Sequence, residues 1–258
     1  MLMPIVPSIS IPTSIIFELR YNYGYEYLDH TGKVINEIIS RPGWNVSKAQ
    51  TDFTSLLNTD EEIIFNFGPQ KLDLVQRVSE TNKELSPIDQ IARLCDDLSL
   101  IIIRQFNLQQ YLRIGFRVHQ LFKADNLEQA KEYVKALKIF TTNLPGETIE
   151  EVSYTIVISE KEWKSRIAIA PAEQRVEIGP ATLKAAQIET HKLAKGQKEA
   201  LMQKMKAKKI IEAFPLYAVL VDIDSYVEDP PIGELKIMDF VKNTYKASLE
   251  KARKYLGG

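Results

Sequence analysis

The chain has 258 residues, which places it in the upper size range of a single domain. Its composition, 45% hydrophobic and 26% charged, is that of a globular protein and excludes a disordered chain. The formal net charge of −1 excludes a uniformly basic protein that binds nucleic acid through its overall charge. Only a local basic patch could provide that function.

The cysteine content and the hydropathy pattern predict a cytoplasmic protein. Cys95 is the only cysteine, so the chain can form neither an internal disulfide nor a zinc site made of cysteines. Residues 1–16 lack a basic start and contain three prolines, which argues against a signal peptide. Purely apolar runs, such as residues 100–103, are far shorter than the roughly 20 residues of a membrane span. We therefore expect no secretion and no membrane partner.

The chain begins with a strand that leads into a helix. Apolar and polar residues alternate over residues 15–21, the period of a strand with one buried face. Helical spacing follows over residues 25–40 and stops at Arg41-Pro42-Gly43. Turn residues then divide the next segment into three predicted strands of an antiparallel meander, at residues 46–57, 62–67 and 71–78.

The helix predicted at residues 88–106 is the clearest element of the sequence. Its apolar residues follow three-four spacing, with Ser86 expected as the N-cap and Pro87 at the first helical position. Cys95 lies on the apolar stripe, so we interpret it as a core residue and not as a nucleophile.

A strand with a basic outer face is predicted at residues 111–118, where Arg113 and Arg117 alternate with apolar residues. Asp125 or Asn126 is expected to cap a short helix after it. The turn that ends at Gly146 suggests a boundary between two lobes, residues 1–146 and 147–258.

The second half repeats the mixture of strands and helices. We predict strands at residues 151–158, 163–169, 175–178 and 216–221, with a partly protruding helix over 181–211 and a final helix up to residue 256. The expected fold class is α+β, with two small antiparallel sheets, packed helices and two intimately associated lobes.

Short motifs in three strands and at the C-terminus resemble those of a known family. They are Phe17-Glu18-Leu19-Arg20-Tyr21, Leu112-Arg113-Ile114-Gly115-Phe116-Arg117, Val221-Asp222-Ile223-Asp224-Ser225-Tyr226 and the terminal Tyr255-Leu256-Gly257-Gly258. Together they resemble a sporadically distributed prokaryotic family of conserved hypothetical proteins of about this length. The resemblance implies an accessory gene, found in mobile or antiviral defence cassettes, and it transfers no catalytic residue.

Acidic residues near a strand end raise the possibility of a metal site. Asp222 and Asp224 point to the same side of the strand, and Glu228 and Asp229 follow closely, so a hard cation could find oxygen ligands there. No glycine-punctuated calcium loop surrounds them, and such carboxylates are more often solvated or paired with Lys and Arg. We therefore predict no metal, no cofactor and no catalytic residue.

Basic residues give the more suggestive pattern. Arg113 and Arg117 on a strand face, together with seven lysines in one helical stretch, could meet phosphates. A solvated helix face explains the lysines at least as well. The candidate nucleic-acid-binding residues are Arg113, Arg117, Lys192, Lys195, Lys198, Lys204, Lys206, Lys208 and Lys209.

The sequence predicts a well-formed hydrophobic core but contains no recognisable set of catalytic residues. This favours a non-enzymatic interaction or accessory module that binds another macromolecule, most simply a protein subunit. Two alternatives stay open. One is a nucleic-acid-binding accessory subunit that uses the lysine-rich helix, and the other is a divalent-metal-dependent enzyme centred on Asp222 and Asp224. The oligomeric state is not predicted.

Overall fold

The computed structural model describes residues 10–22, 24–137, 152–174, 214–233 and 235–257. They form a single nine-stranded antiparallel sheet with the strand order β2-β3-β4-β5-β1-β6-β9-β8-β7. The strands are β1 (Ser10–Tyr21), β2 (Trp44–Ala49), β3 (Thr54–Asn58), β4 (Ile63–Phe67), β5 (Lys71–Arg77), β6 (Tyr111–Ala124), β7 (Tyr154–Ser159), β8 (Lys164–Glu173) and β9 (Tyr217–Glu228). The described helices are α1 (Glu26–Ile39), α2 (Ile88–Gln105), α3 (Leu127–Ala136) and α6 (Ile237–Gly257).

The prediction of two small sheets is wrong, because the strands of both halves belong to one sheet. The long strands β1 and β6 join the halves at the centre, where they pair antiparallel through Phe17 and Phe116. Each half starts with a central strand and a helix, continues with a meander that returns beside that strand, and ends with a helix. The sequence shows this pattern within each half, but it does not show which edge of one half pairs with the other.

The proposed lobe boundary near residue 146 lies outside the described residues, so the division into residues 1–146 and 147–258 stays a prediction. The same holds for the strand predicted at 175–178 and the helix predicted at 181–211.

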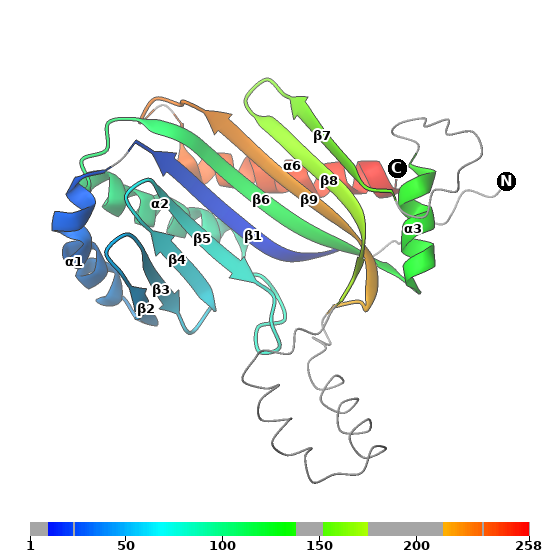
Figure 1. The fold of residues 1–258 in the computed structure, drawn as a ribbon, viewed down its shortest axis with the longest axis horizontal. Helices are drawn as coiled ribbons and strands as arrows, with labels where there is room; N and C mark the ends of the chain where they lie inside the picture. Colours follow the sequence, from blue (N-terminus) through cyan, green and yellow to red (C-terminus); the bar gives the residue numbers. More distant parts are fainter. Residues whose placement is uncertain (1–9, 23, 138–151, 175–213, 234, 258) are drawn as a thin grey trace, which may run out of the picture.

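Helices α2 and α6 lie behind the sheet in Figure 1, and they cover one of its faces. Successive side chains of a strand point to opposite faces of the sheet. Apolar side chains such as Phe17, Leu19, Phe65 and Phe116 point toward the helices and are fully buried. A second cluster of buried residues lies where α3 and the end of α6 meet β8 and β9. The two clusters give the sheet a hydrophobic core on its helix side.

Two local predictions are corrected. The strand predicted over 46–57 is two strands, β2 and β3, because the chain turns where the Gln50 amide donates to the Phe53 carbonyl at 2.8 Å. Ser86 is not the N-cap of α2. That position belongs to Pro87, while the Ser86 hydroxyl accepts a hydrogen bond from the side chain of the buried Gln76 at 2.7 Å.

The predictions for Asn126 and Cys95 are confirmed. Asn126 caps α3 by accepting a hydrogen bond from the Gln129 amide at 2.8 Å. Cys95 is buried on the packed side of α2, and this burial raises the pKa of its thiol. None of the described helices combines the length and the apolarity that crossing a bilayer requires.

Candidate functional site on the open sheet face

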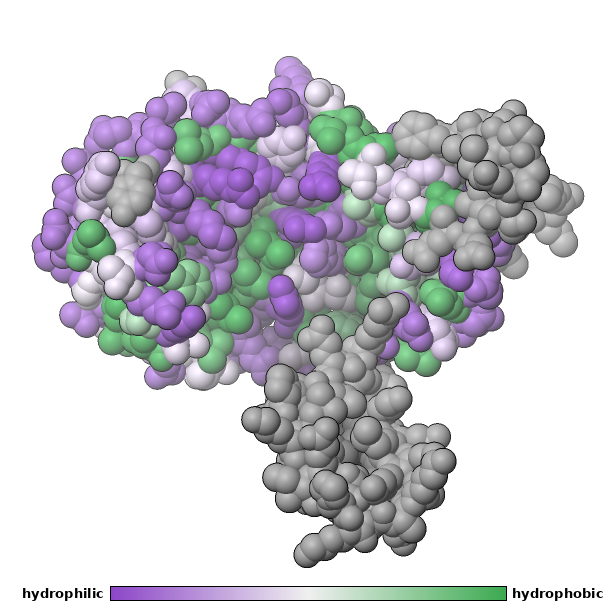
Figure 2. Space-filling view, viewed as in Figure 1, coloured by the Kyte–Doolittle hydropathy of each residue, from purple (hydrophilic) through white to green (hydrophobic). Residues whose placement is uncertain are grey.

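No described helix packs on the second face of the sheet, which we call the open face. Figures 1 and 2 view the molecule from this side, and Figure 2 shows hydrophilic residues across the face between patches of hydrophobic ones. At the centre, the residues of β1, β6 and β9 that alternate with the buried core residues direct their side chains to this face. They line a shallow, open hollow of about 480 Å³.

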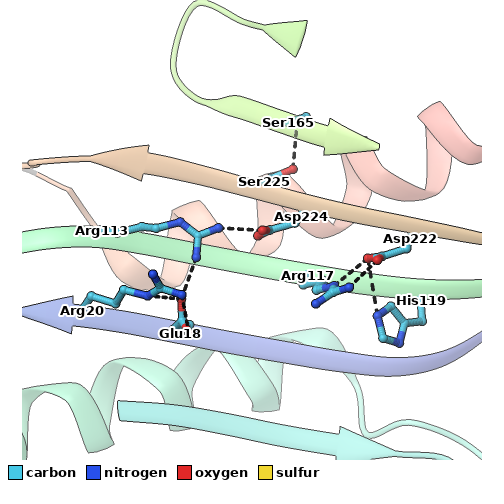
Figure 3. Close-up of polar contacts among 9 residues, drawn as sticks. All are labelled: Glu18, Arg20, Arg113, Arg117, His119, Ser165, Asp222, Asp224 and Ser225. Carbon is cyan, nitrogen blue, oxygen red and sulfur yellow. Dashed lines mark hydrogen bonds and ion pairs between the residues drawn. The ribbon is translucent and has the colours of Figure 1, made fainter. Parts of the chain in front are cut away.

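Arg113 is the centre of a charged network on this face (Figure 3). One guanidinium nitrogen donates to Glu18 of β1 at 2.6 Å and another to Asp224 of β9 at 2.6 Å. The guanidinium also lies 4.6 Å from the ring centroid of Tyr226. It folds back over Gly115, where an added Cβ would lie only 3.4 Å from it, so the missing side chain leaves room for the arginine.

Glu18 connects this arginine to a second one. Its carboxylate accepts from Arg20 at 2.8 Å as well as from Arg113. The side chain of Arg113 is only 19% exposed, whereas that of Arg20 is 52% exposed. Arg113 is therefore fixed within the sheet face, and Arg20 keeps most of its surface in contact with solvent.

A second charged group lies beside the first. Arg117 donates to Asp222 of β9 with Nε at 2.7 Å and with a second guanidinium nitrogen, a bidentate pair. The Nε2 atom of His119 lies 3.4 Å from the same carboxylate (Figure 3). Burial raises the pKa of the Asp222 carboxyl, but the hydrogen bonds from Arg117 and the contact with His119 outweigh it and lower the pKa to about 2.

Basic side chains outnumber carboxylates on the open face of the strands from β5 to β8. The basic ones are Arg20, Lys71, Arg77, Arg113, Arg117, Lys123, Lys164 and Arg166, and the acidic ones are Glu18, Asp73, Asp222, Asp224 and Glu228. The chain as a whole is slightly acidic, so positive charge is concentrated on this face. Such a surface can attract an anionic partner.

The two aspartates of this face are paired with arginines. Asp222 and Asp224 do lie on the same side of β9, as predicted, but each accepts hydrogen bonds from an arginine. Among the described residues, no group of three or more His, Cys, Asp or Glu side chains is placed to hold a metal ion. The guanidinium groups offer planar, directed donors, which suit carboxylate and phosphate groups.

A further polar cluster lies on the helix side of the sheet. The Nζ atom of Lys251 of α6 contacts Glu160 and donates to the Ser165 hydroxyl at 2.9 Å, and this hydroxyl lies 3.1 Å from that of Ser225. Both serines are fully buried, so no substrate can reach them. The cluster stabilises the packing of α6 on β8 and β9.

Of the residues predicted to bind nucleic acid, the structure brings Arg113 and Arg117 together at the centre of the open face. Lys192, Lys195, Lys198, Lys204, Lys206, Lys208 and Lys209 all lie outside the described residues.

Sequence reasoning did not connect the basic residues to their acidic partners. Glu18 and Arg166 were not among the predicted site residues, although both lie on this face. The alternation of β1 and β8 places them on the polar side of their strands, but only the strand order shows that these polar sides are adjacent.

No family model matches this chain, and no curated protein matches it significantly.

Proposed function

We propose that the protein is a non-enzymatic interaction module that binds another macromolecule through the open face of its sheet. One observation carries the proposal. The open face, which no described helix covers, holds a network of arginines and carboxylates joined by hydrogen bonds. A network of this kind keeps a bare sheet face hydrated when it is free, and it presents directed donors to a partner.

The flanks of the network support a macromolecule over a small ligand. Ile64 of β4 is 39% exposed on the open face, beside Leu57 and Val75. Apolar side chains next to fixed charges are the usual make-up of a protein interface, in which apolar contacts supply area and charged groups supply orientation. The hollow is open to solvent, whereas small-molecule sites bury most of their ligand.

The proposal includes a cytoplasmic setting, which the single, buried cysteine supports. It also includes an accessory role in a mobile or defence gene cassette. That part depends on the family resemblance of the sequence motifs alone.

The test compares two charge-reversed variants in the native host. Arg20→Glu with Arg166→Glu reverses two exposed charges on the open face, and Lys33→Glu with Arg93→Glu reverses two exposed charges on α1 and α2. Both variants change the net charge equally. After nuclease treatment, the protein that co-purifies with the wild type should be lost from the first variant and kept by the second. Equal retention by both would refute the open face as the binding surface.

A second candidate, a nucleic-acid-binding accessory subunit, is favoured by the excess of basic side chains on the same face. Sheets can contact nucleic acid with their side chains, and phosphates attract arginine and lysine. Tyr226 is the only Phe, Tyr or Trp residue on the open face of the described strands, so stacking of single-stranded bases has little support.

This candidate predicts a steep dependence on salt. Fluorescence anisotropy with a labelled duplex should show binding at low ionic strength, with a log–log slope of about −0.9 for each phosphate contacted. Arg20→Glu with Arg166→Glu should abolish it. No binding to duplex or single strand at low salt removes the candidate and leaves a protein partner.

A further inference from the structure

The two edges of the sheet are built differently. β2 forms one edge and carries a bulge between Val46 and Lys48, and all of its residues after Trp44 are exposed. A bulge and a lysine are features that discourage the pairing of an edge with another strand. β7 forms the other edge, and its six residues, Tyr-Thr-Ile-Val-Ile-Ser, include no charge, no proline and no glycine.

The backbone of β7 has hydrogen-bonding groups that face away from the sheet. The Glu160 amide donates to the Trp163 carbonyl at 2.9 Å, so these two residues form a hydrogen-bonded pair at the turn between β7 and β8. Pairs alternate along an antiparallel ladder. Ile156 and Ile158 therefore direct their amides and carbonyls toward β8, while those of Thr155, Val157 and Ser159 point outward. In the part of the chain that the structure describes, no strand pairs with this side of β7.

We propose that this edge binds a second copy of the chain, with β7 pairing antiparallel with β7 of the second copy about a twofold axis through Val157. The outward groups fit this arrangement, because Val157 then faces Val157 of the second copy, and Thr155 faces its Ser159. All three outward-facing residues thus find partners in one register, which a symmetric dimer requires.

The side chains agree with the same register. On the helix face, Ile156 lies opposite Ile158 of the second copy, and both are only partly buried against the second core cluster in the single chain. On the open face, Val157 is 59% exposed in the single chain. In the dimer it contacts Val157 of the second copy. Apolar and β-branched pairs stabilise antiparallel strands, and no charge is brought against a like charge. In this register a second copy of the chain satisfies the outward-facing backbone groups of β7.

Sedimentation velocity of the full chain tests this directly. The wild type should shift, over a concentration series, from the 29.5 kDa of one chain to twice that mass. Val157→Lys places two like charges opposite each other and should raise the dissociation constant of the dimer by about tenfold or more. Val46→Lys makes the same change on the β2 edge and should have no effect. A wild type that stays at the mass of one chain at every concentration overturns the proposal, as does a Val157→Lys variant that dimerises normally.

A cross-link provides a second test that does not depend on a charged substitution. Cα atoms of a hydrogen-bonded antiparallel pair are about 5.5 Å apart, within the range of a disulfide. Val157→Cys should therefore form a disulfide-linked dimer under mild oxidation, visible on a non-reducing gel. The native Cys95 is buried and does not compete. Val46→Cys is the matched control, and equal cross-linking of the two variants contradicts the assigned edge.

Discussion

At the scale of single residues, Arg113 has the most constrained position on the open face. It donates to carboxylates from two different strands and contacts the Tyr226 ring. Its charge therefore compensates two carboxylates, Glu18 and Asp224, of which the side chains are only 18% and 22% exposed. Removing the arginine leaves two partly buried carboxylates without its compensating charge. This loss costs more free energy than the loss of an exposed ion pair.

Arg113→Met keeps most of the length of the side chain and removes the charge. We expect it to lower the free energy of unfolding by about 2 kcal/mol, measured by urea denaturation at neutral pH. Arg20→Met is the matched control, since Arg20 pairs with the same Glu18 but is half-exposed. Its expected cost is less than about 1 kcal/mol. Equal costs for the two variants would contradict the central role of Arg113.

The lowered pKa of Asp222 predicts that the protein loses stability in acid. Its pKa in the folded protein is about 2, below the ordinary 3.8, so the folded state favours the ionised carboxyl. This contribution of about 2 kcal/mol is present above the unfolded pKa, and it is lost as the pH falls from about 5 through 2. Urea denaturation across this range should show a smaller acid-induced loss for Asp222→Asn than for the wild type.

The exposed Asp52 supplies the control for that experiment. Asp52→Asn should lose as much stability in acid as the wild type does. If Asp222→Asn behaved in the same way, Arg117 and His119 would not hold the Asp222 carboxylate in its charged form.

At the scale of elements, the helices were the part of the fold that the sequence predicted best. The predicted range 88–106 differs from α2 by a single residue, since the three-four spacing of its apolar residues is a local property. Strands were predicted with less accurate ends. β9 continues to Glu228, well beyond residue 221, because its second half alternates buried residues with the polar residues of the open face.

The turn between α1 and β2 offers a test at this scale. Gly43 has a φ of 78°, and an added Cβ would lie 2.7 Å from an Asp60 carboxylate oxygen and 3.0 Å from Asn58 Oδ1. Asn58 cannot move freely, because its oxygen accepts hydrogen bonds from the Asp60 and Glu61 amides. Gly43→Ala should therefore lower the free energy of unfolding by about 2 kcal/mol, from backbone strain together with crowding.

Gly233→Ala separates these two causes. Gly233 has a similar φ of 89°, but nothing lies within 4 Å of an added Cβ. Thermal or urea unfolding should show a cost of about 1 kcal/mol, from strain alone. If Gly233→Ala cost as much as Gly43→Ala, the close approach of Asn58 and Asp60 would contribute nothing.

At the scale of the whole molecule, the sequence predicted the class of elements but not their assembly. The pairing of β1 with β6 joins residues about a hundred positions apart, such as Phe17 and Phe116, and no local pattern encodes it. That pairing turns two expected sheets into one. It also explains why only part of the candidate site was predicted: Arg113 and Arg117 lie on one strand, whereas Glu18, Asp222 and Asp224 come from its two neighbours.

The central claim, that the open face binds a macromolecule, can be tested by cross-linking in the native host. A photoreactive benzophenone amino acid replaces Ile64, which is 39% exposed on the open face, or Leu100, which is 54% exposed on α2. Both positions carry large, exposed apolar side chains, so the substitutions are comparable. We predict cross-links to a protein or nucleic-acid partner from position 64 and none from position 100. Equal cross-linking from both positions, cross-links from position 100 alone, or none from either would contradict the account.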